Sequence, residues 1–311
     1  MELRYGILST SSIAPRFIAG VRACGKGSIV ALSSRSMEKA REKAALWDIP
    51  RAYSSHEDLL KDEHVNIVYI SNVNSAHYIW AKAALLAGKH VVCEKPCTTT
   101  EAQTLELYDL AQKQGLFFME AQKMLFLPAV LEAKKQLERL GKVTMAELSH
   151  SFPGSYNGWM FDKDAGGGPL LSSGIYAVQL ICWLFGSIAS IQGTASKDEN
   201  GVEWQYILTG QTQSGVLFSA KNSTRAVLDN TCRIFGENGY LELPNYWKAQ
   251  RLCLHLDGQT QTLEFPCEHE LMYEAAHIAQ CLEQGLTCSP VITKALSAAG
   301  ICALERVKRT W

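Results

Sequence analysis

The stretch His90-Val-Val-Cys-Glu-Lys-Pro-Cys97 decides how the first part of the chain folds. His90 to Cys93 is a short run rich in β-branched residues that follows a helical pattern ending at Gly88, so it predicts an inner strand of a parallel sheet. Glu94, Lys95 and Pro96 come directly after this strand. Ligands of open α/β sheets bind at the carboxyl ends of the strands, which makes Lys95 a candidate for chemistry. A lone Lys beside a Glu is more often a surface pair.

Strands and helices alternate on both sides of this stretch. Further buried strands are expected at 3–8, 28–33, 67–70 and 117–121. Helices are expected at 14–24, 37–47 and 76–87, and another helix is expected to end at Gln114, before Gly115. Two capping boxes, Ser54-x-x-Glu57 and Thr98-x-x-Glu101, are expected to open the short helix through Lys61 and the helix that ends at Gln114. Residues 1–121 are therefore predicted to form a doubly wound parallel sheet, which is typical of a dinucleotide-binding domain.

The first strand-to-helix turn occupies the place of the Gly-x-Gly-x-x-Gly/Ala dinucleotide turn. Serines stand at its first two glycine positions, and only Ala14 fits the small third position. A structural turn capped by serines is the alternative reading, but serine hydroxyls can also donate to phosphate oxygens. The residues predicted to hold the cofactor here are Ser9, Thr10, Ser11, Ser12 and Ile13.

The ends of the next strands add further candidate cofactor contacts. No acidic residue follows the second strand, whereas Ser34, Arg35 and Lys39 offer a hydroxyl and two cations to a 2′-phosphate, which favours NADP over NAD. An exposed basic helix start is the alternative interpretation. The third strand is followed by Ser71, Asn72, Asn74 and His77. His77 can bind a ligand or cap its own helix, and the sequence favours neither.

The pattern changes after residue 121. A helix is expected at 128–140 and a strand at 142–152, followed by a loop at 153–164 and the run Gly166-Gly167-Gly168-Pro169. The helix that begins after Pro169 and ends at Phe185 is apolar nearly all round, which predicts burial between layers. Its polar exceptions, Ser172, Tyr176 and Gln179, share one face and are candidates to line a ligand cavity, although Tyr176 also fits an ordinary core position.

The rest of the chain predicts an α+β domain with a mainly antiparallel sheet. Residues 188–265 alternate with period two, with expected strands at 202–209, 216–222, 231–235, 240–243, 252–256 and 261–265 and turns between them. Helices at 270–284 and 293–309 close the chain. Two domains are therefore predicted, a dinucleotide-binding domain at 1–121 and a substrate-binding and dimerisation domain at 122–311.

Composition excludes several other classes of protein. The 311 residues carry a formal charge of −1 and no basic stripe interleaved with aromatics, so no nucleic-acid partner is expected. No apolar run is long enough to span a bilayer, and the N-terminus enters a strand rather than a signal sequence, which predicts a cytoplasmic protein with no membrane partner. The ten cysteines are dispersed and predicted to be reduced, and neither Cys-x-x-Cys nor a His cluster points to a zinc site.

Four motifs in this order resemble one family of oxidoreductases. The N-terminal turn, Glu94-Lys95-Pro96, the segment from Gly166 to Tyr176, and Gly236-Glu237-Asn238-Gly239 are similar to the glucose-fructose oxidoreductase, inositol dehydrogenase and MocA-like family over essentially the full length. Phe118-Met119-Glu120-Ala121 and Gly174-Ile175-Tyr176 look most like its dimeric dihydrodiol dehydrogenase type. The resemblance implies an NAD(P) domain, a C-terminal sheet that forms a homodimer or homotetramer interface, and hydride transfer at a CH–OH or C=O carbon.

By position, Lys95 matches the family lysine that binds substrate oxygen and cofactor and transfers a proton, and Tyr176 matches the second-domain Tyr or His that orients the same oxygen. A lysine is a poor base at neutral pH, but burial and a nearby nicotinamide cation would lower its pKa. Serines replace the turn glycines, Ser172 stands where relatives commonly have Asp, and Leu125 stands where dihydrodiol-type relatives have Arg. A small polyol, sugar or cyclic diol is the expected substrate. The alternative is a non-catalytic dinucleotide-binding regulator, against which the presence of Lys95 and Tyr176 argues.

Overall fold

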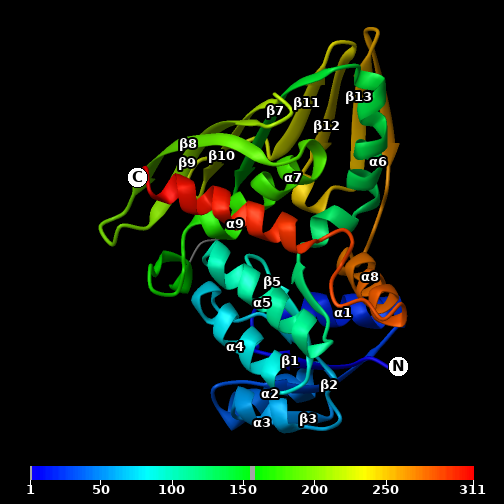
Figure 1. The fold of residues 1–311 in the computed structure, drawn as a ribbon, viewed down its shortest axis with the longest axis vertical. Helices are drawn as coiled ribbons and strands as arrows, with labels where there is room; N and C mark the ends of the chain where they lie inside the picture. Colours follow the sequence, from blue (N-terminus) through cyan, green and yellow to red (C-terminus); the bar gives the residue numbers. More distant parts are fainter. Residues whose placement is uncertain (1, 155–157) are drawn as a thin grey trace. The chain divides into compact units, whose positions relative to one another are not determined.

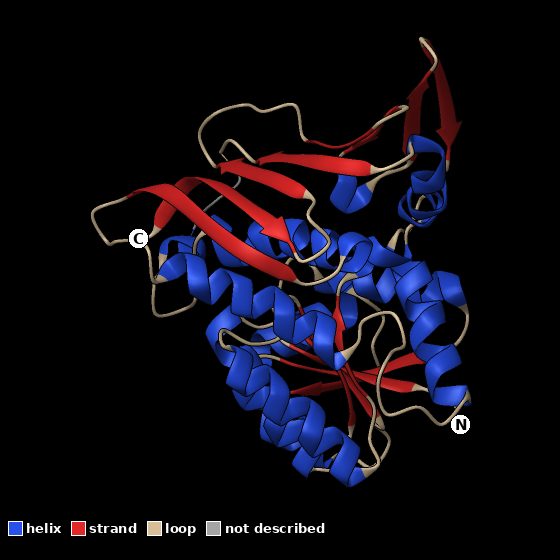
Figure 2. Cartoon of the chain, turned by 45° about the horizontal axis from the view of Figure 1, so that its top comes forward, coloured by secondary structure: helices blue, strands red, loops and turns tan. Residues whose placement is uncertain are grey.

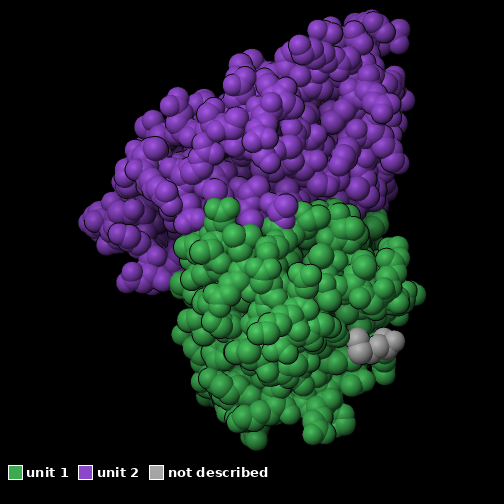
Figure 3. Space-filling model, viewed as in Figure 1, with its two compact units in different colours: residues 1–123, 269–294 green, residues 124–268, 295–311 purple. Residues whose placement is uncertain are grey.

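The chain divides into two compact units, residues 1–123 with 269–294 and residues 124–268 with 295–311 (Figure 3). The computed structural model describes residues 2–154 and 158–311; residues 155–157, within the loop expected at 153–164, lie outside the described residues. The domain division 1–121 and 122–311 stays a prediction, and the units differ from it by placing helix α8 (Leu271–Glu283) in the first unit. This helix packs on α1 (Ala14–Cys24) so closely that a Cβ at Gly20 would lie 2.8 Å from the backbone of Leu271.

The first unit is built around a parallel sheet (Figures 1 and 2). The order of its strands is β3-β2-β1-β4-β5-β6. Its strands are β1 (Arg4–Leu8), β2 (Ser28–Ser33), β3 (Arg51–Tyr53), β4 (Ile67–Ile70), β5 (His90–Glu94) and β6 (Phe118–Ala121). The remaining helices are α2 (Met37–Leu46), α3 (His56–Lys61), α4 (Asn74–Leu86) and α5 (Glu101–Gln114). The strand order reverses beside β1, where β1 pairs with both β2 and β4, and this is the point at which doubly wound sheets bind dinucleotides.

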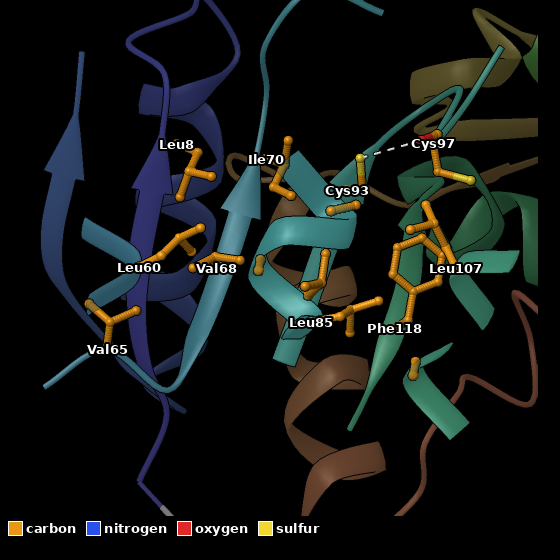
Figure 4. Close-up of a cluster of buried hydrophobic side chains, with 14 of the residues drawn as sticks. Leu8, Leu60, Val65, Val68, Ile70, Leu85, Cys93, Cys97, Leu107 and Phe118 are labelled. Atoms are coloured by element: carbon orange, nitrogen blue, oxygen red, sulfur yellow. Dashed lines mark hydrogen bonds between the residues drawn. The ribbon is translucent and has the colours of Figure 1, made fainter. Parts of the chain in front are cut away.

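Apolar side chains fill both faces of this sheet, as expected for inner parallel strands. On one face, Leu60 from α3, Leu85 from α4 and Leu107 from α5 pack on the strands in a single cluster (Figure 4). On the other, the Phe17 ring of α1 stacks on Tyr69 of β4 with 3.7 Å between ring centroids. Burial on both faces fixes the strand ends that carry the candidate site.

The second unit contains a larger sheet with the order β14-β13-β12-β11-β7-β10-β9-β8. The β7–β10 pair is parallel and the other pairs are antiparallel. The strands are β7 (Val143–Ser151), β8 (Ile188–Lys197), β9 (Glu203–Thr212), β10 (Leu217–Ser223), β11 (Thr231–Gly236), β12 (Gly239–Pro244), β13 (Arg251–Leu256) and β14 (Gln259–Glu264). Helices α6 (Pro128–Gln136), α7 (Ile175–Phe185) and α9 (Lys294–Lys308) complete the longer elements, α9 beginning at the last residue of the first unit. The predicted fold class is confirmed.

The buried helix expected after Pro169 does not begin as an α-helix. Residues Leu170–Gly174 form a π-helical turn, and α7 continues from it. The first backbone N–H of this turn, at Leu170, donates to the buried carboxylate of Glu203 at 3.0 Å. Gly168 has φ 98°, and a Cβ there would collide with the same carboxylate. Glycine at position 168 is therefore required by the close approach of Glu203 to the backbone.

Some local predictions were wrong. Helix α3 is capped by Ser55, whose side chain accepts from the N–H of Asp58, rather than by Ser54; α5 is capped by Thr100 rather than Thr98. Each helix begins later than predicted, because Ser55 and Thr100 are also residue types that cap helices, and their side chains accept from the N–H groups of Asp58 and Gln103. The short edge strand β3 and the strand β8 were not named from the sequence, although β8 lies within the segment recognised as alternating.

Among the residues that the structure describes, no helix has the length and apolar content needed to cross a bilayer. The cysteines of the described residues are free, and most are buried or half-buried.

Candidate functional site

The carboxyl ends of β5 and β6 place Lys95 in a half-buried, strongly charged surrounding. The Glu94 carboxylate is held by the Tyr69 hydroxyl, which donates at 2.5 Å, and by the backbone N–H of Lys95 at 3.2 Å. The Glu120 carboxylate accepts from the backbone N–H of Cys97 at 3.0 Å. These bonds fix the Glu94-Lys95-Pro96 turn, whose Lys95–Pro96 peptide is cis, from both sides.

Burial lowers the pKa of Lys95 from its ordinary value. The carboxylates of Glu94 and Glu120 act in the opposite direction, and the guanidinium of Arg16 lowers this pKa further. Desolvation penalises the charged form of an amine, so Lys95 is closer to a neutral amine at physiological pH than a lysine in water. A primary amine in this state can accept a proton or return it.

The N-terminal turn retains the backbone shape of a dinucleotide turn without its glycines. Ser9 has φ 88°, in the region that normally favours glycine, and its N–H donates to the carbonyl of Ser33. The Ser11 hydroxyl donates to that of Ser71 at 2.8 Å, which ties the turn to the end of β4. No side chain caps α1 and no acidic residue lies in its first turn. These features fit the pyrophosphate of a dinucleotide, which binds at such a helix start.

The end of β2 places the predicted 2′-phosphate residues at the surface. Arg35 and Lys39 are exposed. Ser34 is buried, and its backbone N–H donates to the backbone carbonyl of Tyr53. The side chain that caps α2 is Ser36, which accepts from the N–H of Lys39 at 3.3 Å. Both cations therefore remain available at the start of this helix.

The end of β4 carries a buried polar group centred on Asn72. The Asn72 amide contacts the His56 ring at 3.0 Å, and its side-chain oxygen is buried with no hydrogen-bond partner among the described residues. His77 is buried and neither caps α4 nor faces outward, because its ring nitrogens contact the carbonyl oxygens of Pro96 at 2.8 Å and Asn72 at 2.9 Å. The reading of His77 as a cap of α4 is therefore wrong, and its ring braces the Lys95 turn; its predicted contact with the cofactor stays a prediction. Asn74, in the first turn of α4, is also buried.

In the second unit, the predicted polar stripe lies partly in the π-helical turn, which holds Ser172, and partly in α7, which holds Tyr176 and Gln179. The Ser172 hydroxyl donates to the carbonyl of Gly168 at 2.9 Å, so this side chain is engaged with its own turn. Tyr176 is buried to 8% exposure and lies 6.5 Å, ring centroid to centroid, from His150 on β7. The His150 ring in turn packs against the Trp247 ring, with 3.6 Å between the ring centroids. His150 and Trp247 were not predicted, and the period-two pattern of β7 was the available signal for His150.

Three charged residues of the first unit were also missed. Lys123 follows β6, and Glu270 and Glu274 lie at the start of α8. The rule that ligands bind at strand carboxyl ends could have found Lys123, because β6 ends beside β5. Among the described residues, no group of His, Cys, Asp and Glu side chains is arranged to hold a metal ion.

The fold and this edge of charged and hydroxyl-bearing side chains define a nicotinamide-dependent oxidoreductase. The family model described as "Oxidoreductase family, NAD-binding Rossmann fold" matches residues 3–122, and the GFO/IDH/MocA C-terminal domain model matches residues 130–242. The chain belongs to this GFO/IDH/MocA oxidoreductase family, as its motifs predicted, and it is an NAD(P)-dependent dehydrogenase or reductase.

Several relatives are trans-1,2-dihydrobenzene-1,2-diol dehydrogenases. The mouse and human enzymes are each 31% identical to this chain, with 99% of this chain and 97% of the relative covered. Solved structures share the fold: a levoglucosan dehydrogenase in complex with NADH and levoglucosan (TM-score 0.90, 18% identity, 100% of this chain and 97% of that chain covered) and a 3-ketoreductase from Actinomadura kijaniata in complex with NADP (TM-score 0.92, 21% identity, 100% and 98% covered).

Proposed function

We propose that this chain transfers hydride between NADP and a CH–OH or C=O carbon of a small polyol, sugar or cyclic diol. The observation that carries the proposal is Lys95, an amine at the carboxyl end of β5 whose pKa is lowered by burial. The names of the relatives, dehydrogenases of dihydrobenzene diols, support a vicinal diol on a six-membered ring. The alternative, a non-catalytic dinucleotide-binding regulator, has no need of such an amine.

In the oxidation direction, the carbinol C–H bond breaks and its electron pair leaves as hydride, while the hydroxyl O–H proton must leave as the carbonyl forms. The bound nicotinamide supplies the hydride acceptor or donor. Neutral Lys95 accepts the hydroxyl proton at Nζ, and in reduction the ammonium returns it. The Tyr176 hydroxyl is proposed to hydrogen-bond the same substrate oxygen and orient it. Glu94 and Glu120 keep the lysine turn in place through the Tyr69, Lys95 and Cys97 bonds.

The proposed cofactor contacts follow the ends of β1, β2 and β4. Ser9, Thr10, Ser11, Ser12 and Ile13 are proposed to hold the pyrophosphate at α1, and Ser34, Arg35 and Lys39 to hold the 2′-phosphate of NADP. Ser71, Asn72 and Asn74 are proposed to line the nicotinamide half. Asn72 supports this, because its buried side-chain oxygen has no partner among the described residues and can accept from a ribose hydroxyl or a carboxamide.

We further propose a homodimer formed through the outer face of the second unit's sheet. Met145 and Leu217 are register partners on β7 and β10, and both are exposed, as is Ile207 on β9. Apolar side chains gathered on one exposed sheet face are typical of a protein–protein interface.

The experiment is a comparison of the wild type with Lys95→Met and Tyr176→Phe on a panel of cyclic diols, sugars and polyols, followed at the nicotinamide absorbance. Lys95→Met is expected to lower kcat by about 10²–10⁴-fold, because proton transfer is lost. Tyr176→Phe removes one hydrogen bond and is expected to lower kcat/KM by about 10- to 100-fold. Full activity of Lys95→Met would contradict the assignment.

The cofactor assignment is tested by titrating NADPH and NADH against the intrinsic fluorescence. NADPH is expected to bind more tightly, and Arg35→Ser to weaken NADPH binding by about 10-fold or more while leaving NADH unchanged, because a charge-assisted bond to the 2′-phosphate is lost. Tighter binding of NADH than of NADPH would show that the preference is for NAD.

A further inference from the structure

A row of hydrogen-bonded side chains, Ser33–His56–Asn72, crosses the carboxyl edge of the parallel sheet from β2 to β4. The Ser33 hydroxyl, at the end of β2, lies 2.7 Å from His56 Nδ1. His56 Nε2 lies 3.0 Å from the amide nitrogen of Asn72, which follows β4. Because β2 and β4 flank β1, this polar row spans the point at which the strand order reverses and doubly wound sheets bind dinucleotides.

Both ends of the polar row are tied to the N-terminal turn that is predicted to hold the pyrophosphate. The backbone carbonyl of Ser33 accepts from the N–H of Ser9 at 3.2 Å. At the other end, the hydroxyl of Ser71, the residue before Asn72, accepts from the hydroxyl of Ser11 at 2.8 Å. The polar row therefore lies beside the predicted cofactor site and is joined to it by hydrogen bonds.

The hydrogen bonds of His56 determine which atom of Asn72 is left without a partner. An amide nitrogen only donates, so His56 Nε2 accepts from Asn72, and the single proton of a neutral ring lies on Nδ1 and is donated to Ser33. Burial lowers the pKa of His56, which agrees with a neutral ring. The Trp80 ring of α4 packs edge to face on the His56 ring, with 4.6 Å between centroids. The side-chain oxygen of Asn72 is buried and has no hydrogen-bond partner among the described residues.

We propose that His56 is a positioning residue which, as its Nδ1–H tautomer, holds the Asn72 amide so that the amide oxygen faces the bound dinucleotide and accepts a hydrogen bond from it. The proposal rests on the proposed function, in which Asn72 contacts the cofactor. An acceptor repels phosphate oxygens, so the group bound by this oxygen is a ribose hydroxyl or the carboxamide NH₂. With the proton on Nε2, Asn72 would have to turn its oxygen toward His56 and present its NH₂ group to the cofactor. The tautomer of His56 therefore decides which kind of cofactor group Asn72 binds.

The tautomer can be measured in the protein without cofactor. In protein labelled with ¹⁵N at histidine, the His56 signals are assigned by their loss in His56→Phe, and the couplings between ring protons and ring nitrogens identify the protonated nitrogen. A proton on Nδ1 alone at neutral pH supports the proposal. A proton on Nε2, alone or together with one on Nδ1, overturns it.

The second test is a double-mutant cycle read by the Kd of NADPH. His56→Phe keeps an aromatic ring against Trp80 but removes both nitrogens, and is expected to raise the Kd by about 5- to 10-fold because the Asn72 amide is no longer held. Asn72→Leu removes the acceptor and is expected to raise the Kd by about 10-fold. The double variant is expected to bind as Asn72→Leu does, within about 2-fold, because His56 acts only through Asn72. Two effects that multiply, or a His56→Phe variant with the wild-type Kd, would overturn the proposal.

His90→Phe is the matched control. The His90 ring is half-buried in the same unit, and its Nδ1 accepts from the N–H of Phe117 at 2.9 Å, but His90 lies at the amino end of β5, on the opposite edge of the sheet. It is expected to leave the Kd of NADPH unchanged, and a loss equal to that of His56→Phe would contradict the role of the polar row. Urea unfolding checks that each variant is folded.

Failure of the proposed function gives different results. A wild type that binds neither NADPH nor NADH, or a Lys95→Met variant with full activity, would refute that function whatever the tautomer of His56. A wild type that binds NADPH and needs Lys95, with an unchanged Kd in His56→Phe, would refute only the positioning role of His56.

Discussion

Ser9 shows how a single residue can keep a backbone shape that its own side chain opposes. Its φ of 88° lies where a Cβ crowds the backbone, yet the turn still makes its bond from the Ser9 N–H to Ser33. The serine supplies a hydroxyl at the helix start and pays for it in local strain. The absence of glycine in the motif therefore weakened the sequence signal without changing the turn.

The strain predicts that Ser9→Gly stabilises the protein. Relief of the Cβ contact is worth about 1–2 kcal/mol and the added freedom of glycine in the unfolded chain costs about 0.5–1 kcal/mol, so a net gain of about 0.5–1 kcal/mol in the free energy of unfolding is expected. Urea unfolding measures it. The control is Ser12→Gly in the same turn, where φ is not positive and a small loss is expected. Equal effects of the two changes would contradict the strain argument.

At the site, the sequence predicted residues that follow strands and missed those that arrive from elsewhere. Lys95, Ser71 and Asn72 follow directly from the alternation of strand and helix, because parallel strands end at one edge. Glu270 and Glu274 reach the same edge on α8, a helix distant in the sequence that the period alone assigned to the second domain. The sheet that a helix covers depends on tertiary packing, here the close contact between α1 and α8 at Gly20. Hydrophobic periodicity along the sequence does not predict such packing.

At the scale of elements, the bounds of the long periodic segments were predicted within about three residues, while the cap residues of α3 and α5 were not predicted correctly. Two adjacent serines, Ser54 and Ser55, both fit a cap, and in the structure the cap is Ser55, the second residue after the end of strand β3. That strand is three residues long and pairs only with β2, so it leaves little pattern to detect. The unpredicted π-helical turn before α7 likewise depends on a distant group, the Glu203 carboxylate.

The cap assignment makes a paired prediction. Ser55→Ala removes the acceptor for the Asp58 N–H, which is 3.1 Å from the Ser55 hydroxyl, and is expected to lower the free energy of unfolding by about 1 kcal/mol. Ser54→Ala changes an exposed side chain and is expected to cost less than about 0.5 kcal/mol. Chemical denaturation of both variants separates them. A larger loss in Ser54→Ala would restore the cap that the sequence suggested.

At the scale of the whole molecule, the two sheets differ in how many of their faces are buried. The parallel sheet of the first unit is covered by apolar packing on both faces, which is why its strands read as continuous apolar runs. The sheet of the second unit alternates, with buried residues such as Phe218 and Ala220 on one face of β10 and exposed Leu217 and Lys221 on the other. That outer face holds Met145, Ile207 and Leu217, which are larger and more apolar than a solvated face requires.

The proposed homodimer makes this face decisive for assembly. Ile207, 58% exposed on β9, pairs in register with Lys221 of β10 and lies among the outer-face residues. Ile207→Glu is expected to convert a dimer into a monomer in size-exclusion chromatography with light scattering. In a two-fold interface the change occurs twice. Each copy is expected to destabilise the dimer by about 1.5–3 kcal/mol through lost apolar burial, and each also adds the cost of burying a carboxylate. Val227→Glu, which alters a highly exposed apolar residue in the loop between β10 and β11, is the matched control and is expected to remain dimeric. A wild type that is monomeric at micromolar concentration, or an Ile207→Glu variant that stays dimeric, would remove this face from the interface.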